Sequence, residues 1–162
     1  PMVNKEQLIY GFALNLSLIR RQCDGLEHED SLRQPPFRGN CLNWVLGHIL
    51  VGRDRVLHLL GEKPTLSTEE KKHYETNSDP ITEDSEENLE LADLLARLRS
   101  AQEHISTGLQ RATPEDLSKA IDIENPTVTI GKEIFGLYFH DTYHTGQTEL
   151  LRQLAGTNDK VV

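Results

Sequence analysis

Two histidines four residues apart, His140 and His144, stand in an apolar-periodic segment near the end of the chain. In a helix, this spacing places both imidazoles on one face, where they can share one metal ion. A third histidine, His48, lies far upstream in a second apolar-periodic segment. Histidine is the commonest protein ligand for transition metals, and three imidazoles leave a coordination position open for water or substrate. The three histidines therefore predict a catalytic metal site, on the condition that the two segments pack together.

The ligand set alone leaves the divalent metal ion open among zinc, nickel, manganese and iron, because the order of affinities does not select one of them. One alternative is structural: His48 would be a core residue bonded to a backbone carbonyl, and the other two would be ordinary helix residues. Another treats the pair as a variant of the His-Glu-x-x-His zinc-protease motif, with Asp141 as general base. It is weaker, because aspartate is one methylene shorter than glutamate and Asp159 is the sole acid at a useful distance downstream.

Asp141 and Gln147 are the nearest candidates for a catalytic general base, or for a partner that fixes the tautomer of a ligand. Asp141 lies about 100° around the helix from His140, so a solvated surface position is an alternative for it. A capping role or packing at a dimer face is the alternative for Gln147. The other histidines lie outside the predicted site and are expected in solvent: His28, His58, His73 and His104.

Four amphipathic segments must position these side chains. Apolar residues recur in them at spacings of three and four, as in helices with one buried stripe, over residues 5–24, 40–60, 86–112 and 130–155. Asn40 and Thr129 are candidate N-caps of the second and fourth segments, and Gly156 is a candidate stop signal. The pattern predicts an all-α four-helix bundle that forms a single domain over residues 1–162.

Between residues 62 and 90, ten acidic side chains face three basic ones. This composition predicts a solvated connection, with a short helix that begins at a capping box of Ser67 and Glu70.

Composition narrows the class of protein. The chain has 162 residues, of which 36% are hydrophobic, enough for one compact domain. A net charge of −9 argues against nucleic-acid binding, which needs clustered Lys and Arg. No apolar run is long enough for a membrane span or a signal peptide, so no membrane partner and a cytoplasmic location are expected. Cys23 and Cys41 make no disulfide framework and are expected as free thiols.

Two stretches resemble a known family. The first is NCLNWVLGHI over residues 40–49, in which Trp44 precedes His48 by four residues. The second is FHDTYHTGQ over residues 139–147, followed by LRQLAG over residues 151–156. Together with the order and length of the expected helices, they resemble the DinB/YfiT-like superfamily over nearly the whole chain.

The resemblance implies a four-helix bundle, commonly a homodimer, with a divalent metal held by His48, His140 and His144. The superfamily includes S-transferases and isomerases that use a low-molecular-weight thiol, and metal-dependent hydrolases. It implies no DNA binding. Members often carry Glu directly after the second histidine and Arg or His near the third, whereas this chain has Asp141 and Thr145 there.

The expected function is therefore that of a metal-dependent transferase or hydrolase that acts on a small-molecule substrate. One alternative is a non-catalytic metal-binding or stress-response protein that stores or senses an ion, with the acidic connection as its responsive segment. The other is a dimerisation module that has lost its metal.

Overall fold

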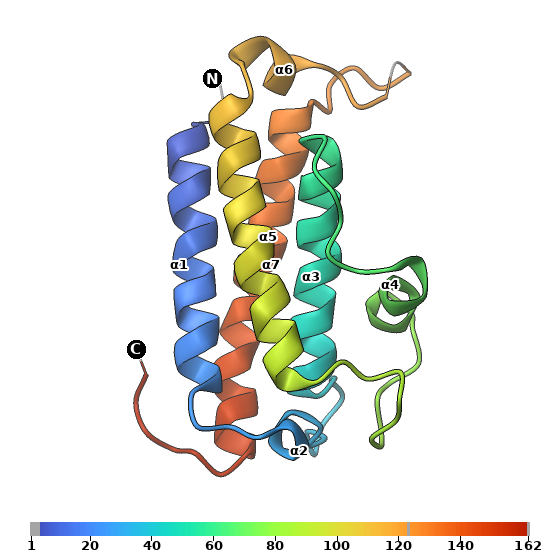
Figure 1. Cartoon of the computed structure of the whole chain (residues 1–162), viewed down its shortest axis with the longest axis vertical. Coiled ribbons are helices and arrows are strands. Elements are labelled where there is room, and N and C mark those ends of the chain that lie inside the picture. The colour runs from blue at the N-terminus through green and yellow to red at the C-terminus, as the bar shows by residue number, and fades with distance from the viewer. Residues whose placement is uncertain (1–3, 123, 162) are drawn as a thin grey trace.

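Four long helices lie side by side in the computed structural model, which describes residues 4–122 and 124–161 (Figure 1). They are α1 (Lys5–Cys23), α3 (Leu42–Leu59), α5 (Leu91–Arg111) and α7 (Ile130–Leu154). Three short helices connect them: α2 (His28–Ser31), α4 (Thr68–Tyr74) and α6 (Pro114–Ser118). The described residues form no β-strand beyond an isolated bridge between Ala120 and Thr129. The prediction of an all-α protein is confirmed.

The four long helices enclose one core. Helices α3 and α1 each pack against both α7 and α5. The stripes found in the sequence face inward and meet there, and several of the apolar side chains are fully buried: Phe12, Ile19, Leu46, Ile49, Leu98, Ile105 and Ile134. Because α3 and α7 are direct neighbours, the helices that carry the three histidines are in contact.

The predicted start of α1 at Lys5 and both predicted end signals of α7 are confirmed, whereas the starts of α3 and α5 differ from the prediction. The Thr129 hydroxyl accepts a hydrogen bond from the backbone of Lys132 at 3.4 Å, and Gly156 takes a φ of +91° just after the helix. Asn40 is not the N-cap of α3. The cap is Cys41, which is 1% exposed and makes no side-chain capping bond. Burial of Cys41 and Leu42, and not a polar cap, sets where this helix begins.

Helix α5 begins five residues later than the apolar pattern predicts, at Leu91 and not at residue 86. The residues before it form a turn, in which the Asn88 side chain donates to the Glu83 carbonyl at 3.0 Å. The backbone N–H of Leu89 donates to the Tyr74 hydroxyl at 2.8 Å. These tertiary hydrogen bonds hold the segment in a non-helical conformation that the pattern alone does not indicate.

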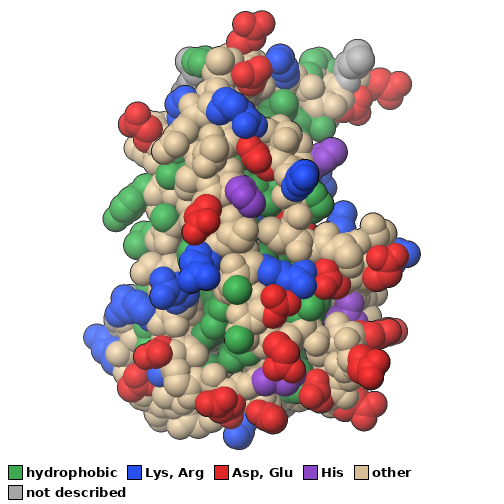
Figure 2. Space-filling view, viewed as in Figure 1, with side chains coloured by type: hydrophobic (Ala, Val, Ile, Leu, Met, Phe, Trp, Pro, Cys, Tyr) green, Lys and Arg blue, Asp and Glu red, His purple; other side chains and the backbone are tan. Residues whose placement is uncertain are grey.

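The acidic connection contains α4, which starts at the predicted capping box: the Ser67 hydroxyl accepts from the Glu70 backbone, and the Glu70 carboxylate accepts from that of Ser67. Acidic side chains gather on the side of the molecule where α4 and the following loop lie (Figure 2). The connection is not wholly solvated, however. Tyr74 is fully buried against α3, where a Cβ on Gly47 would lie 2.1 Å from its ring. Gly47 therefore makes room for Tyr74.

In the described part of the chain, no helix has both the length and the apolar character that a bilayer crossing needs.

Candidate metal centre

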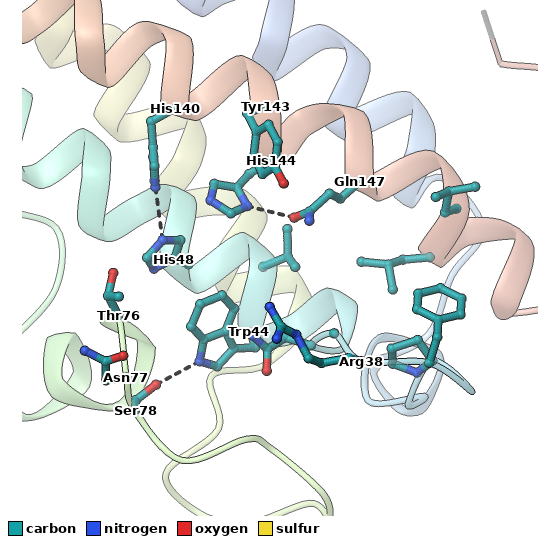
Figure 3. Close-up of a pocket in the computed structure, with 17 residues that line it drawn as sticks. Arg38, Trp44, His48, Thr76, Asn77, Ser78, His140, Tyr143, His144 and Gln147 are labelled. Atoms are coloured by element: carbon teal, nitrogen blue, oxygen red, sulfur yellow. Dashed lines mark hydrogen bonds between the residues drawn. The ribbon is translucent and has the colours of Figure 1, made fainter.

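The packing of α3 on α7 brings the three predicted ligands together. One nitrogen from each of His48, His140 and His144 lies within 4.8 Å of the other two. The Nε2 atoms of His48 and His140 are 3.0 Å apart, and the ring centroids are separated by 4.5 to 4.9 Å. His48 is buried and the other two are half-buried. The rings converge on a common point at one wall of a cavity (Figure 3).

Hydrogen bonds to the outer nitrogens orient two of the rings. His48 Nδ1 donates to the Tyr74 carbonyl at 2.8 Å, and His144 Nδ1 donates to Gln147 Oε1 at 2.7 Å. With the protons on Nδ1, both rings carry their lone pair on Nε2, which is the tautomer that a metal-binding imidazole needs. The orienting residues come from different places, one from the end of α4 and one from the next turn of α7.

His140 is held differently. Its Nδ1 atom is buried and has no hydrogen-bond partner in the described part of the chain. A Cβ on Gly52 would lie 3.2 Å from this nitrogen, so the glycine leaves the ring the space it occupies. Packing and not hydrogen bonding therefore positions His140.

All three imidazoles are neutral at pH 7. Burial, and after it the neighbouring His144 and His48, lower the pKa of His140 to about 4. Burial also lowers the pKa of His48, against the opposing effect of its bond to the Tyr74 carbonyl. The pKa of His144 is likewise lowered by burial, which outweighs its bond to Gln147. Neutral imidazole is the form that binds a metal, so the donor set fits a divalent transition-metal ion.

Trp44 completes the α3 side of the site. Its ring stacks on His48, with centroids 4.5 Å apart and planes inclined by 15°. The indole Nε1 donates to the Ser78 hydroxyl at 2.8 Å. His48 thus binds the last residue of α4 and Trp44 binds the segment that follows it. This segment closes one side of a cavity of about 610 Å³ (Figure 3).

The comparison with known proteins gives the family of the chain and agrees with its fold. The sequence profile of the DinB superfamily matches residues 13–148. The chain belongs to the DinB superfamily. Among solved structures, a conserved protein from Enterococcus faecalis has the same fold, with 18% sequence identity and a TM-score of 0.75 over 98% of this chain and 100% of that one. No curated protein matches the chain significantly.

Asp141 of this DinB-superfamily protein does not reach the cavity. It is 2% exposed, and its carboxylate accepts hydrogen bonds from Arg53 Nε at 2.7 Å and from Asn15 Nδ2 at 2.8 Å. The alternative of a solvated surface position is therefore wrong, and the carboxylate does not line the cavity, where a general base would have to act. Thr145 is also buried, and its hydroxyl donates to the Asp141 carbonyl at 2.8 Å. Gln147, by contrast, lines the cavity.

These placements remove the zinc-protease alternative. A general base must reach a water beside the metal, whereas the Asp141 carboxylate is occupied by Arg53. Asp159, the acid that could have completed the ligand set, instead pairs with Arg152 at 3.0 Å.

Sequence reasoning missed Arg53, which at 1% exposure is the most deeply buried charged side chain among the residues that the structure describes. A signal was present, because Arg53 interrupts the apolar run of α3, and a charge in such a run needs a buried partner.

The four remaining histidines are predicted in solvent, and for two of them this prediction is wrong. The His28 side chain is 12% exposed, and its Nδ1 accepts from the backbone N–H of Leu91 at 3.2 Å, at the start of α5. His73 is 20% exposed and bonds Asn88 at 2.9 Å. Both hold the turn that delays the start of α5. His58 and His104 are exposed, as predicted.

Proposed function

We propose that this DinB-superfamily protein is a metal-dependent enzyme that binds one divalent ion through His48, His140 and His144. The observation that carries the proposal is the convergence of three neutral imidazoles on the wall of a cavity of about 610 Å³. A cavity of this size accommodates a small molecule. Zinc, nickel, manganese and iron all accept three imidazoles, with a remaining position open to the cavity.

The reaction classes proposed are thiol-dependent S-transfer and hydrolysis. A bound ion would supply Lewis acidity, which lowers the pKa of a water or holds a thiolate for attack on an electrophile. The chain's own residues orient the ligands: the Tyr74 carbonyl fixes His48, and Gln147 fixes His144. Gln147 therefore takes the role of tautomer-fixing partner in this proposal, and Asp141 that of a positioning residue.

A thiol for S-transfer would come from solution and not from the chain. Burial raises the pKa of Cys23 to about 12 and also raises that of Cys41, and both side chains are buried. Neither cysteine lines the cavity beside the histidines. This supports a low-molecular-weight thiol as co-substrate.

The arrangement of α1, α3, α5 and α7 supports a four-helix bundle of the DinB kind, as one domain over residues 1–162. The homodimer stays a prediction, as does the cytoplasmic location. Large exposed side chains on α7, among them Phe135 at 55% and Phe139 at 67%, favour association of two copies. Sedimentation velocity at micromolar concentration is the direct measurement.

A sensing role is the second candidate, and one contact favours it. The hydrogen bond from His48 to the Tyr74 carbonyl joins a ligand to the acidic connection. A metal that repositions His48 would pull on this segment. Hydrogen exchange over residues 62–90 with and without zinc separates the two roles, because an enzyme needs no change there and a sensor requires one.

The test of the metal site is elemental analysis of untagged protein. We expect about one ion per chain in the wild type and none in His144→Ala, with helix content by circular dichroism unchanged. His104→Ala is the matched control, because His104 is exposed on α5, away from the cavity. Metal retained at full stoichiometry in His144→Ala would overturn the assignment. A wild type that takes up no added zinc, nickel or manganese would do so as well.

A further inference from the structure

The cavity beside the histidines has an unusual charge for this protein. The chain carries a net charge of −9, yet no aspartate or glutamate is found among the described residues that line the cavity. Arg38 is the one lysine or arginine in that lining. A neighbouring surface hollow over α4 and its following loop shows the opposite character, with six acidic side chains: Glu69, Glu70, Asp79, Glu83, Glu86 and Glu87.

Arg38 is available to a ligand. It lies in the segment between α2 and α3, its side chain is exposed, and it forms no ion pair or hydrogen bond with any residue that the structure describes. Figure 3 shows it beside Trp44, on the side of the cavity away from His140. A guanidinium group offers a planar fork of N–H donors, which matches a carboxylate in two parallel hydrogen bonds.

Apolar side chains from both long helices also line the cavity. Trp44 and Val45 line it from α3, and Tyr143 and Leu150 line it from α7. Leu150 is 59% exposed, so this part of the wall offers apolar surface that a ligand would cover. The cavity therefore combines one arginine, apolar wall surface beside it and a cluster of imidazoles.

We propose that Arg38 is the specificity-determining residue of this cavity and binds the carboxylate of a small organic acid, whose apolar body lies against Trp44. This inference rests on the proposed function only for the end of the molecule that reacts, which would face the histidines. Acidic residues elsewhere on the chain repel anions, so a cavity lined without carboxylates and with one arginine selects for them locally.

Trp44 makes this testable, because it is the single tryptophan of the chain and lines the cavity. Its fluorescence is titrated in chelator-treated protein at low salt and pH 7.5, with phenylacetate and with its neutral analogue phenylacetamide. The variant is Arg38→Gln. The matched control is Arg33→Gln, which removes an exposed arginine from the same segment. Arg33 pairs with Asp30 and does not line the cavity.

We expect the wild type and Arg33→Gln to bind phenylacetate roughly fivefold tighter than phenylacetamide, a modest ratio because Arg38 is exposed to solvent. In Arg38→Gln the ratio should fall to about one, with phenylacetamide binding unchanged. An unchanged ratio, or no binding of phenylacetate to the wild type, would overturn the proposal. Tighter binding of phenyl phosphate than of phenylacetate would overturn the carboxylate assignment.

The metal site is tested separately. The titration uses metal-free protein, so the anion preference is measured whether or not the three histidines hold an ion. Elemental analysis of Arg38→Gln should show the wild-type metal content, because the hydrogen bonds that orient His48 and His144 come from Tyr74 and Gln147 and not from Arg38. Loss of metal in this variant would show that Arg38 supports the metal site itself, which contradicts a role limited to substrate specificity.

Discussion

His140 and Asp141 are consecutive residues of α7 that lie on two different sides of the helix. The two sides differ in how far the buried polar groups are satisfied by hydrogen bonds. On one side, the Asp141 carboxylate is saturated by Arg53 and Asn15. On the other, His140 Nδ1 is buried without a described partner, and its Nε2 shares a hydrogen bond only with another imidazole, that of His48, at 3.0 Å. The saturated side holds helices together, whereas the unsaturated side has nitrogen lone pairs left to bind something else.

The saturated side involves every long helix. Arg53 of α3 donates to Asp141 of α7, to Gln102 of α5 at 3.3 Å and to the Phe12 carbonyl of α1 at 3.2 Å. Asn15 of α1 donates to Asp141 as well. A buried polar network stabilises a protein only when all its members have hydrogen-bond partners. This network binds α7 to its neighbouring helices at the turn that carries the histidine pair.

The largest effect is expected from breaking the saturated side. Asp141→Ala leaves the guanidinium of Arg53 buried and uncompensated, which costs about 3–5 kcal/mol of folding free energy. The measurement is urea unfolding followed by circular dichroism. Arg33→Ala, which breaks the exposed pair with Asp30 at 3.0 Å, is the control and should cost about 0–1 kcal/mol.

The double variant Asp141→Leu, Arg53→Met tests whether the loss of folding free energy comes from an unpaired buried charge. Removing both charges should cost less than the sum of the two single changes, because neither charge is left unpaired. A loss in Asp141→Ala no larger than that in Arg33→Ala would show that the network does not hold α7 in place.

A smaller effect is expected from Gln147→Ala on the unsaturated side. Without its carbonyl acceptor, His144 loses the hydrogen bond that fixes its tautomer, so metal affinity should fall about 10- to 100-fold. Competition with a chromogenic chelator measures this affinity. Gln153→Ala changes an exposed glutamine of the same helix and should leave the affinity as it is. Equal metal affinities in the two variants would show that Gln147 does not orient His144 for metal binding.

The smallest effect is expected from pH, in metal-free protein. Burial lowers the pKa of His140 to about 4 in the folded state, whereas an unfolded histidine titrates near 6.5. Between these values the unfolded chain binds more protons than the folded chain. The contribution of His140 to the free energy of unfolding is therefore fully present above about pH 6.5 and is lost as the pH falls toward 4.

The thermal midpoint of chelator-treated protein should therefore drop from pH 7.5 to pH 5. The drop should be smaller in His140→Gln, which removes the titrating group while the carboxylates that also titrate in acid are kept. Identical drops in both proteins would contradict a lowered pKa at this position.

The helices and two of their caps could be predicted from the sequence because they depend on neighbours along the chain. Three of the four long helices begin and end within two residues of the expected bounds. The exception is the start of α5, where His28 and Tyr74 bind the backbone of Leu91 and Leu89 from outside the segment. No local pattern reports such partners.

The sequence by itself determined that His140 and His144 share one helix face, since helical periodicity is a property of adjacent residues. It also singled out His48, by its place in an apolar helix. Only the tertiary structure decided that the three rings meet, and that Asp141 turns to Arg53, 88 residues away in the chain, and not to the cavity. The physical reason is that a buried charge takes the partner that folding brings to it, and long-range packing chooses that partner.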